Sequence, residues 1–193
     1  NKLDGIDLDF EWAENEKEYK DYSLAILKMR EVLGDKYLFS VSLHPVCYKI
    51  SKEAIEAVDF ISLQCYGPSP VRFPIEKYCS DIQMVLEYGI PKEKLVAGVP
   101  FYGVTKDNSK KTEAYFNFVQ NGLVTSPAQN EVIYQGDTYV FDGQDNIRIK
   151  TRYAKEQKLK GMMSWDLATD LPLSDSRSLL KLSLIHISEP TRP

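Results

Sequence analysis

Residues 4–11 read DGIDLDFE and carry four acidic side chains in eight residues: Asp4, Asp7, Asp9 and Glu11. Side chains alternate between the two faces of a strand, so Asp7, Asp9 and Glu11 share one face. The apolar side chains between them share the other face, while Asp4 falls out of this alternation at the start of the strand. Like charges stacked on one face, roughly 6–7 Å apart in series, destabilise a sheet.

Three interpretations fit this acidic face: a solvated surface strand, a metal site, or a set of coupled catalytic carboxylates. A solvated face usually mixes in Lys and Thr, and this one contains neither. Counted from Asp7, the sequence also lacks the glycine that a calcium-binding loop places at its sixth position, where Trp12 stands. The sequence therefore favours catalytic carboxylates, and we expect no metal and no cofactor. We expect Ile6, Leu8 and Phe10 to be buried on the opposite face.

The composition limits the class of protein. The chain has 193 residues, of which 43% are hydrophobic and 27% charged, which is enough for one sizeable core. The formal charge of -4 gives no basic bias, so a nucleic-acid partner is not expected. No run of ~18 apolar residues is present, so no membrane span is expected. Cys47, Cys65 and Cys79 follow no metal-ligand spacing, and their odd number leaves at least one without a partner in the chain.

Apolar segments alternate with segments of helical periodicity along the chain. The predicted strands are 3–11, 37–43, 59–66, 94–103 and 161–167. The predicted helices are 15–33, ending at Gly34; 51–58, with Ser51 as N-cap; 75–89, closed by Gly89; 146–158; and a last one that begins near Ser174. Residues 104–144 are polar and irregular with two strand-like pieces, VIYQ and TYVFD, and are predicted to be an insertion.

Alternation of mostly apolar strands with helices indicates parallel βαβ units. A doubly wound sheet and a (β/α)8 barrel both fit this pattern. Glu11, Tyr66 and Trp165 lie at or near the ends of their strands, where the active site of a barrel lies, and this favours the barrel. Because the five predicted strands cannot close an eight-stranded barrel, we predict an α/β fold, a partial TIM barrel that lacks about three βα units.

The stretch DGIDLDFE fits the pattern D-G-x-D-x-D-x-E and resembles the signature of glycoside hydrolase family 18, the chitinases and related endo-N-acetylglucosaminidases. Residues 63–66 (LQCY), 94–103 (KLVAGVPFYG) and 139–170 resemble later segments of the same family. The resemblance covers roughly residues 3–180. It implies that the acidic strand is the fourth of the barrel and that residues 1–181 supply strands four to eight, with the insertion at 104–144 after strand seven.

The resemblance also implies roles for the acidic residues. Glu11 matches the proton donor, and Asp9 matches the acid that orients the N-acetyl group of the substrate. Asp7 matches the acid behind it, and Asp4 matches a structural acid. Clustered carboxylates raise one another's pKa and can share a proton.

Two further residues match substrate contacts of the family, and a third is a candidate for one. Tyr66 matches a hydroxyl that holds the acetamido group, and Trp165 matches the aromatic floor of the sugar site. The family often places Asp or Asn after this tyrosine, whereas Gly67 stands here. Gln64, on the same face as Tyr66, is a candidate for the missing polar contact with substrate.

The activity implied is hydrolysis of β-1,4-linked N-acetylglucosamine polymers by substrate-assisted, retaining catalysis. Two alternatives stay open: an endo-β-N-acetylglucosaminidase acting on N-glycans or peptidoglycan, and a lectin-like barrel that binds without cleaving. Lectin-like relatives typically lack the acid that is retained here as Glu11. The family implies a secreted, cell-surface or periplasmic enzyme that is monomeric when complete, and the piece alone is expected to be inactive.

Other candidates have simpler interpretations. His44 ends its strand and is expected at the rim of the site, while Asp166 and Asp170 are expected to be loop or cap acids. Residues 182–193, LSLIHISEPTRP, look like the translation of a common transposase sequencing adapter. Tags of this kind are excluded from fold reasoning, so this segment is expected to do no structural work, and its prolines to break any continued helix.

Overall fold

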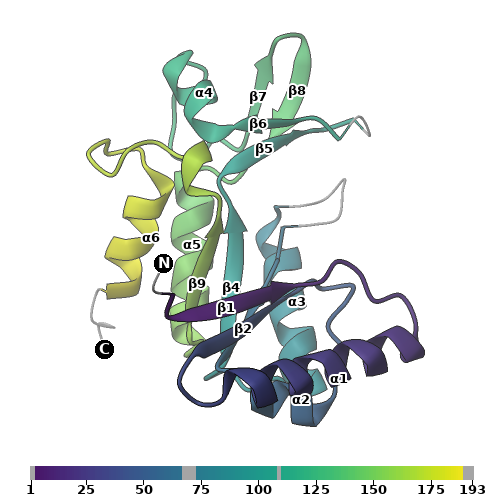
Figure 1. Ribbon diagram of the computed structural model, residues 1–193. Helices are drawn as coiled ribbons and strands as arrows, with labels where there is room; N and C mark the ends of the chain where they lie inside the picture. Colours follow the sequence, from purple (N-terminus) through teal and green to yellow (C-terminus); the bar gives the residue numbers. More distant parts are fainter. Residues whose placement is uncertain (1–2, 67–72, 108–109, 189–193) are drawn as a thin grey trace.

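The computed structural model describes residues 3–66, 73–107 and 110–188 (Figure 1). The strands are β1 (Gly5–Asp9), β2 (Leu38–Leu43), β3 (Phe60–Leu63), β4 (Leu95–Pro100), β5 (Tyr102–Thr105), β6 (Thr112–Ala114), β7 (Glu131–Tyr134), β8 (Asp137–Val140) and β9 (Gly161–Trp165). The helices are α1 (Glu16–Leu33), α2 (Lys52–Ala57), α3 (Ile75–Tyr88), α4 (Tyr115–Gln120), α5 (Gln144–Glu156), the 3-10 helix η1 (Leu167–Thr169) and α6 (Leu179–Ser188).

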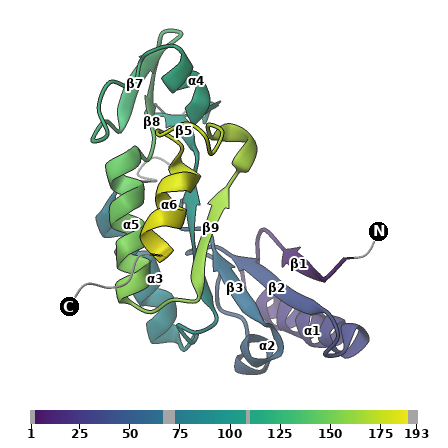
Figure 2. The same cartoon turned by 90° about the vertical axis from the view of Figure 1, so that its left-hand side faces the viewer.

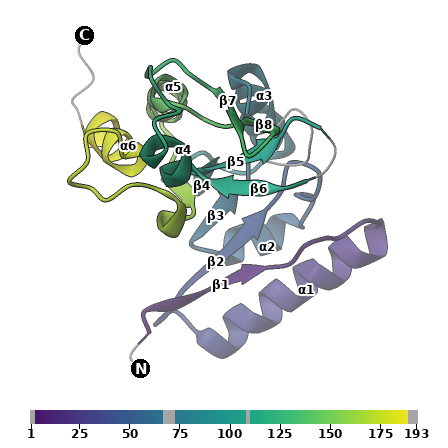
Figure 3. The same cartoon turned by 90° about the horizontal axis from the view of Figure 1, so that it is seen from above.

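The larger sheet is parallel throughout and has the order β1-β2-β3-β4-β9. Each strand is followed by a crossover that returns the chain to the same end of the sheet, as predicted from the alternation of strands and helices (Figures 1 and 3). Within the described residues β1 pairs with β2 alone, so its other edge carries no strand. All carboxyl ends therefore lie at one end of the sheet, with the acidic segment at its margin.

The core forms between one face of this sheet and the helices that cover it. Alternate side chains of β2, β3 and β4 are buried there, among them Val41, Ile61 and Ala97, each with no exposed area. Ile26 of α1 and Ile82 of α3 are buried in the same cluster. Burial of such side chains contributes roughly 1.5–3 kcal/mol each, so this face supplies most of the stability of the sheet.

Three helix boundaries follow the predicted caps at Gly34, Ser51 and Gly89, and Asn15 is an N-cap in addition to these. The Asn15 side chain accepts a hydrogen bond from the Glu18 N–H at 3.0 Å, and the Ser51 hydroxyl accepts one from Ala54 at 3.2 Å. Gly34 ends α1 with φ of 61°, and Gly89 ends α3 with φ of 115°. Both glycines adopt left-handed conformations that a side chain would disfavour, so they stop the helices where the sequence predicted.

The predicted insertion is more regular than its polar sequence indicates. The predicted strand 94–103 splits into β4 and β5, and β5 joins an antiparallel sheet of order β6-β5-β8-β7. The strand-like pieces VIYQ and TYVFD correspond to β7 and β8, but the prediction of irregular structure was wrong. This sheet projects beyond the carboxyl ends of β4 and β9 (Figures 1 and 2). Phe118 of α4 packs against Tyr139 and Phe141 and gives it a small aromatic core.

A buried ion pair joins the end of this antiparallel sheet to α5. The Lys150 Nζ lies 2.6 Å from the Asp142 Oδ2, and both side chains are fully buried. Asn146 donates a second hydrogen bond to the other carboxylate oxygen, at 3.1 Å. Removing one partner of such a pair leaves an uncompensated buried charge, so the pair fixes the point where the chain leaves the insertion and enters α5.

The outer face of β1 differs from the prediction. Ile6 and Phe10 are each 44% exposed, and Leu8 is only partly buried, so the expectation that all three are buried was wrong. The reason is the position of β1 at the edge, where α1 alone covers it. Phe10 keeps one contact with this helix, at 5.2 Å between its ring and that of Tyr22.

The end of the chain also departs from the prediction. The last helix begins at Leu179 instead of near Ser174, because Asp170 caps it: its carboxylate accepts hydrogen bonds from the Leu179 and Leu180 N–H groups. This helix continues through Ser188, and the prolines expected to break it, Pro190 and Pro193, lie outside the described residues. The expectation that the segment does no structural work was wrong for Leu182 and Ser183, which pack against the rest of the chain. The Ser183 hydroxyl lies 3.3 Å from that of Thr151 on α5. The adapter origin of the segment remains a prediction.

Two further observations concern the whole described chain. Cys47, Cys65 and Cys79 are all free thiols. Among residues 3–66, 73–107 and 110–188, no helix combines the length and the apolar character that crossing a lipid bilayer requires.

Deleting residues 182–193 should destabilise the protein. The truncation removes the partly buried Leu182 and the Thr151–Ser183 contact, so we expect the free energy of unfolding to fall by about 1–2 kcal/mol in urea titrations. Truncation after Ser183 is the matched control, because it keeps both contacts and removes the exposed Leu184 and Ile185. Equal stability of the full chain and the chain that ends at Lys181 would contradict a structural role for residues 182–188 of α6.

Candidate active site

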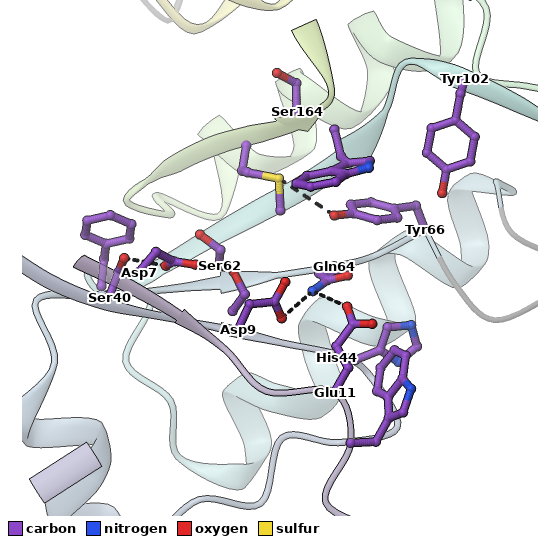
Figure 4. A pocket seen from close by; sticks show the side chains of 15 residues that line it. Asp7, Asp9, Glu11, Ser40, His44, Ser62, Gln64, Tyr66, Tyr102 and Ser164 are labelled. Atoms are coloured by element: carbon purple, nitrogen blue, oxygen red, sulfur yellow. Dashed lines mark hydrogen bonds between the residues drawn. The ribbon is translucent and has the colours of Figure 1, made fainter. Parts of the chain in front are cut away.

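A hollow of about 700 Å³ lies against the uncovered face of the parallel sheet, toward the carboxyl ends of the strands (Figure 4). All five parallel strands or the segments directly after them contribute to it. Its lining comprises Asp7, Asp9, Glu11, Trp12, Ser40, Ser42, His44, Phe60, Ser62, Gln64, Tyr66, Tyr102, Met163, Ser164 and Trp165.

Asp7 is held by two serine hydroxyls of the neighbouring strand. The register pairs Asp7 with Ser40 and Asp9 with Ser42, so both serines face the same side as the acids. The Ser40 hydroxyl donates to one carboxylate oxygen, and the Ser42 hydroxyl donates to the other at 2.9 Å. Hydrogen bonds to both oxygens favour the charged form of a carboxylate and fix its orientation.

Asp9 and Glu11 are bridged by one amide group. The Gln64 Nε2 lies 3.2 Å from the Asp9 Oδ1 and 3.0 Å from the Glu11 Oε1, as the dashed lines of Figure 4 show. The Gln64 side chain is buried, whereas both acids keep solvent exposure. The two carboxylates thus lie side by side and share one donor residue from β3's carboxyl end.

The pKa of Asp9 is raised above its ordinary value. The largest cause is the partial loss of hydration in the hollow, followed by the negative charges of Glu11 and Asp7. The hydrogen bond from Gln64 acts in the opposite direction and lowers the pKa. The neighbouring carboxylates therefore help to raise the pKa of Asp9, as the strand alternation predicted.

Glu11 lies two residues beyond the end of β1, on a segment anchored by the turn after β2. The Trp12 ring meets the His44 ring edge-on at 4.5 Å, and the Ala13 N–H donates to the Cys47 Sγ at 3.1 Å. The peptide bonds Glu11–Trp12 and Trp165–Asp166 are cis. The His44 Nδ1 accepts a hydrogen bond from the Val46 N–H at 3.2 Å, and His44 lines the hollow beside Trp12, the rim position expected of it.

Tyr66 closes the far side of the hollow. Its ring is 6% exposed, and its hydroxyl lies 3.9 Å from the Met163 Sδ. Burial, with the charges of nearby acids, raises the pKa of the Tyr66 hydroxyl well above its usual range, so the group stays protonated and can donate. Gly98 on β4 makes room for this ring, since a Cβ there would lie 2.9 Å from the Tyr66 Cε1.

Trp165 ends β9 and presents its indole to solvent at the hollow, with 55% of the residue exposed. Its carbonyl accepts a hydrogen bond from the Phe101 N–H at 2.8 Å, which fixes the backbone. The next residue, Asp166, caps η1 by accepting from the Ala168 N–H at 2.8 Å. Asp166 and Asp170 are therefore cap acids, as the sequence indicated, while Trp165 offers an aromatic surface of the kind on which sugar rings stack.

The hollow brings together six of the seven predicted site residues: Asp7, Asp9, Glu11, Gln64, Tyr66 and Trp165. Asp4 is exposed and is not part of the lining, and its carbonyl accepts a hydrogen bond from the Leu38 N–H at 2.9 Å. Gly67, where the sequence departs from the family pattern, lies outside the described residues.

Sequence reasoning missed the serines that hold Asp7, together with Tyr102, Met163 and Trp12. The serines had a usable signal, because the alternation in YLFSVSL places Ser40 and Ser42 on one face, opposite the apolar residues. Tyr102 and Met163 had none, since their positions depend on how β4, β5 and β9 meet.

No group of three His, Cys, Asp or Glu side chains within the described ranges is arranged to hold a metal ion. Asp7 accepts hydrogen bonds from two serine hydroxyls, and Asp9 and Glu11 accept them from the Gln64 amide. The hollow places two bridged carboxyl groups, which can exchange protons with a bound molecule, beside an aromatic surface and a tyrosine hydroxyl.

The model of the family "Glycosyl hydrolases family 18" matches residues 1–170. The class V chitinase CHIT5b of Medicago truncatula is 24% identical over 87% of this chain and 59% of its own length. The GH18 chitinase ChiB of Flavobacterium johnsoniae is 27% identical, with a TM-score of 0.78 over 96% of this chain and 60% of that chain. A chitinase of Bacteroides thetaiotaomicron is 20% identical, with a TM-score of 0.83 over 96% of this chain and 64% of that one. The chain spans about half the length of the curated relatives it matches.

Replacing Asp9 with asparagine should stabilise the protein at neutral pH. Because the pKa of Asp9 is raised on folding, the folded chain binds more protons than the unfolded one between the ordinary value of 3.8 and the raised value. Stability from this group therefore falls as the pH rises through that interval. We expect Asp9→Asn to raise the melting temperature at pH 7 and to lose this advantage below about pH 4.

Asp35→Asn, which removes the same charge from an exposed turn remote from the site, is the control for this experiment. The two variants should differ in the pH dependence of melting, measured by circular dichroism. An advantage of Asp9→Asn that is constant from pH 4 to pH 7 would show that the raised pKa of Asp9 is not its cause.

Proposed function

The chain belongs to glycoside hydrolase family 18, and from this premise we propose that it carries the acid machinery of an enzyme that hydrolyses β-1,4-linked N-acetylglucosamine polymers. The observation that carries the proposal is the pair Asp9–Glu11, two bridged carboxylates in a hollow that also contains Tyr66 and Trp165. An aromatic surface, a tyrosine hydroxyl and an acid pair match the apolar face, the acetamido group and the glycosidic oxygen of such a sugar.

Glu11 is the general acid in this proposal. It donates a proton to the glycosidic oxygen while the carbonyl oxygen of the substrate's own acetamido group attacks the anomeric carbon and displaces the leaving sugar. The products of this step are the released chain end and a cyclic oxazolinium ion, with Glu11 now ionised. Glu11 then takes a proton from water, which attacks the same anomeric carbon and opens the ring with the β-configuration retained.

Asp9 and Tyr66 act on the acetamido group. The Asp9 carboxylate accepts the acetamido N–H and stabilises the positive charge that develops on the ring, while the Tyr66 hydroxyl donates to the acetamido oxygen and orients it. Asp7, held by its two serines, keeps a fixed orientation behind Asp9. Trp165 forms the floor on which the sugar at the cleaved bond rests.

We also propose that β1, β2, β3, β4 and β9 are strands four to eight of an eight-stranded barrel. The parallel sheet, its open edge at β1 and the partial coverage of the related chains support this assignment. Further βα units would pair with β1 and cover Ile6 and Phe10. The chain alone would then lack part of the substrate cleft and be inactive, and assays of turnover require the completed barrel.

Two alternative functions of the same barrel fold are left for experiment to decide. An endo-acting enzyme on N-glycans or peptidoglycan would use the same acid pair and differ in the loops around it. A lectin-like barrel would bind the polymer without cleaving it, and the presence of Glu11 in contact with Gln64 disfavours this alternative. An enzyme of this kind acts on an extracellular polymer, so we place the complete protein outside the cytoplasm.

Glu11→Gln should abolish turnover while preserving binding in the completed barrel. The substitution keeps the side-chain shape and removes the transferable proton, and general acid catalysis contributes about 10²–10⁴-fold. We expect kcat on chitin oligosaccharides to fall at least a hundredfold, with the dissociation constant for the oligosaccharide nearly unchanged in calorimetry. Full activity of this variant would overturn the proposed function.

The substrate-assisted route makes a separate prediction about substrates and products. Oligosaccharides of glucose, or chitosan without the N-acetyl group at the cleaved sugar, should not be hydrolysed, because they lack the internal nucleophile. Proton NMR of the fresh product should show the β-anomer. Cleavage of cello-oligosaccharides, or an initial α-anomer, would contradict the route even if Glu11 is essential.

A further inference from the structure

Gln64 holds a position that the proposed catalytic steps do not explain. Its backbone is fixed at the carboxyl end of β3, where its N–H donates to the Leu43 carbonyl at 2.8 Å. Its side chain is 8% exposed, and its Nε2 alone contacts two ionisable groups, the Asp9 Oδ1 at 3.2 Å and the Glu11 Oε1 at 3.0 Å (Figure 4). An amide oxygen in this place would face two acceptors, so the nitrogen is the group that fits.

The geometry favours one oxygen of each acid as the carrier of a proton. An amide nitrogen has two N–H bonds that diverge, so each carboxyl group receives one of them. The Asp9 Oδ1 and the Glu11 Oε1 are therefore acceptors, and the protonated oxygen of a carboxyl group is the weaker acceptor of its two. Each hydrogen bond from Gln64 therefore favours the proton on the other oxygen, which is Oε2 of Glu11 and Oδ2 of Asp9.

We propose that Gln64 is a positioning residue that selects the protonated oxygen of Glu11 and keeps the two acids in one fixed arrangement for catalysis. Both of its N–H groups are engaged, so it acts on the substrate through the two acids rather than by direct donation to the sugar. This inference rests on the proposed function and deepens it. It replaces the substrate-contact role expected of Gln64 from the sequence.

The surroundings of Asp9 decide how this role is measured. The charged groups facing Asp9 are Asp7 and Glu11 of the same segment, while Tyr22 of α1 and Tyr66 after β3 are the nearby hydroxyls. Burial raises the pKa of both tyrosines, so neither changes charge near neutral pH. The hydrogen bond from Gln64 lowers the pKa of Asp9, and its loss should raise that pKa further.

The test is Gln64→Met, which preserves length and removes both donors. In the completed barrel we expect kcat to fall about 10- to 100-fold, the loss typical of hydrogen bonds to charged groups, while KM changes less than about threefold. The acidic limb of the kcat profile should move to higher pH. In the 193-residue chain itself, carbon-detected NMR titration should show the Asp9 carboxyl titrating at higher pH than in the unsubstituted chain.

Gln64→Glu separates positioning from filling of space. It has the same shape but places a third carboxyl group against the acid pair, so activity should be lower than in Gln64→Met near neutral pH. It should recover in part at lower pH, where a protonated Glu donates one hydrogen bond. Gln83→Met is the matched control, because it also breaks an amide-to-carboxylate bond, to Glu87 at 2.9 Å, on the exposed face of α3.

The outcomes distinguish this inference from the proposed function. A Gln64→Met variant with unchanged kcat, unchanged pH profile and unchanged Asp9 titration would overturn the positioning role and leave Glu11 as the general acid. A loss of kcat together with a matching loss of thermal stability, and an unchanged Asp9 titration, would also overturn it, since that is a structural defect. Full activity of Glu11→Gln would instead remove the proposed function on which it rests.

Discussion

Each carboxylate in and just after β1 needs a hydrogen-bond donor. The arrangement of this structure depends on that constraint. Asp7 and Asp9 of β1 and Glu11 just beyond its end repel one another and cannot be left unpaired in a hollow. The hydroxyls that satisfy Asp7 come from β2, and the amide that satisfies Asp9 and Glu11 comes from the end of β3. The order β1-β2-β3 and the parallel register that aligns Asp7 with Ser40 are thus required by the acids as well as by the apolar face behind them.

The two faces of the sheet carry different kinds of side chain because of this constraint. The covered face carries the buried aliphatic core, and the uncovered face carries small or polar side chains, such as Ser62 and Gly98, that leave room for larger groups. The raised pKa of Asp9 shows that the uncovered face costs stability at neutral pH. That cost is offset in the buried aliphatic core, so the acids are held in position by packing in which they take no part.

Local sequence patterns predicted the acidic face, the parallel βαβ order and the caps at Gly34, Ser51 and Gly89. All of these depend on residues close together in the sequence. The same reasoning failed where distant segments decide the outcome. Ile6 and Phe10 are exposed because β1 lies at an edge, a fact of topology that their apolar pattern does not contain. The antiparallel sheet formed because β5 pairs with β8, more than thirty residues later, in a segment whose polarity indicated a loop. Gln64 was selected as a polar residue on the correct face, but its bridging of two acids depends on how far β3 extends past β1.

The edge position of β1 also affects the chemistry of the acids. Asp9 ends β1, which pairs with β2 alone among the described strands, and Glu11 follows just beyond it. Both side chains are exposed, so water reaches them and weakens their mutual repulsion. In the barrel we propose, further strands beside β1 would remove this water, and the effective dielectric around the pair would fall. Repulsion between the two charges and the hydrogen bonds from Gln64 would both become stronger, and the state in which the pair shares one proton would be favoured over the doubly ionised state. Completion of the barrel would therefore do more than build the cleft, because it would supply the low-dielectric surroundings that favour a single proton shared by the pair.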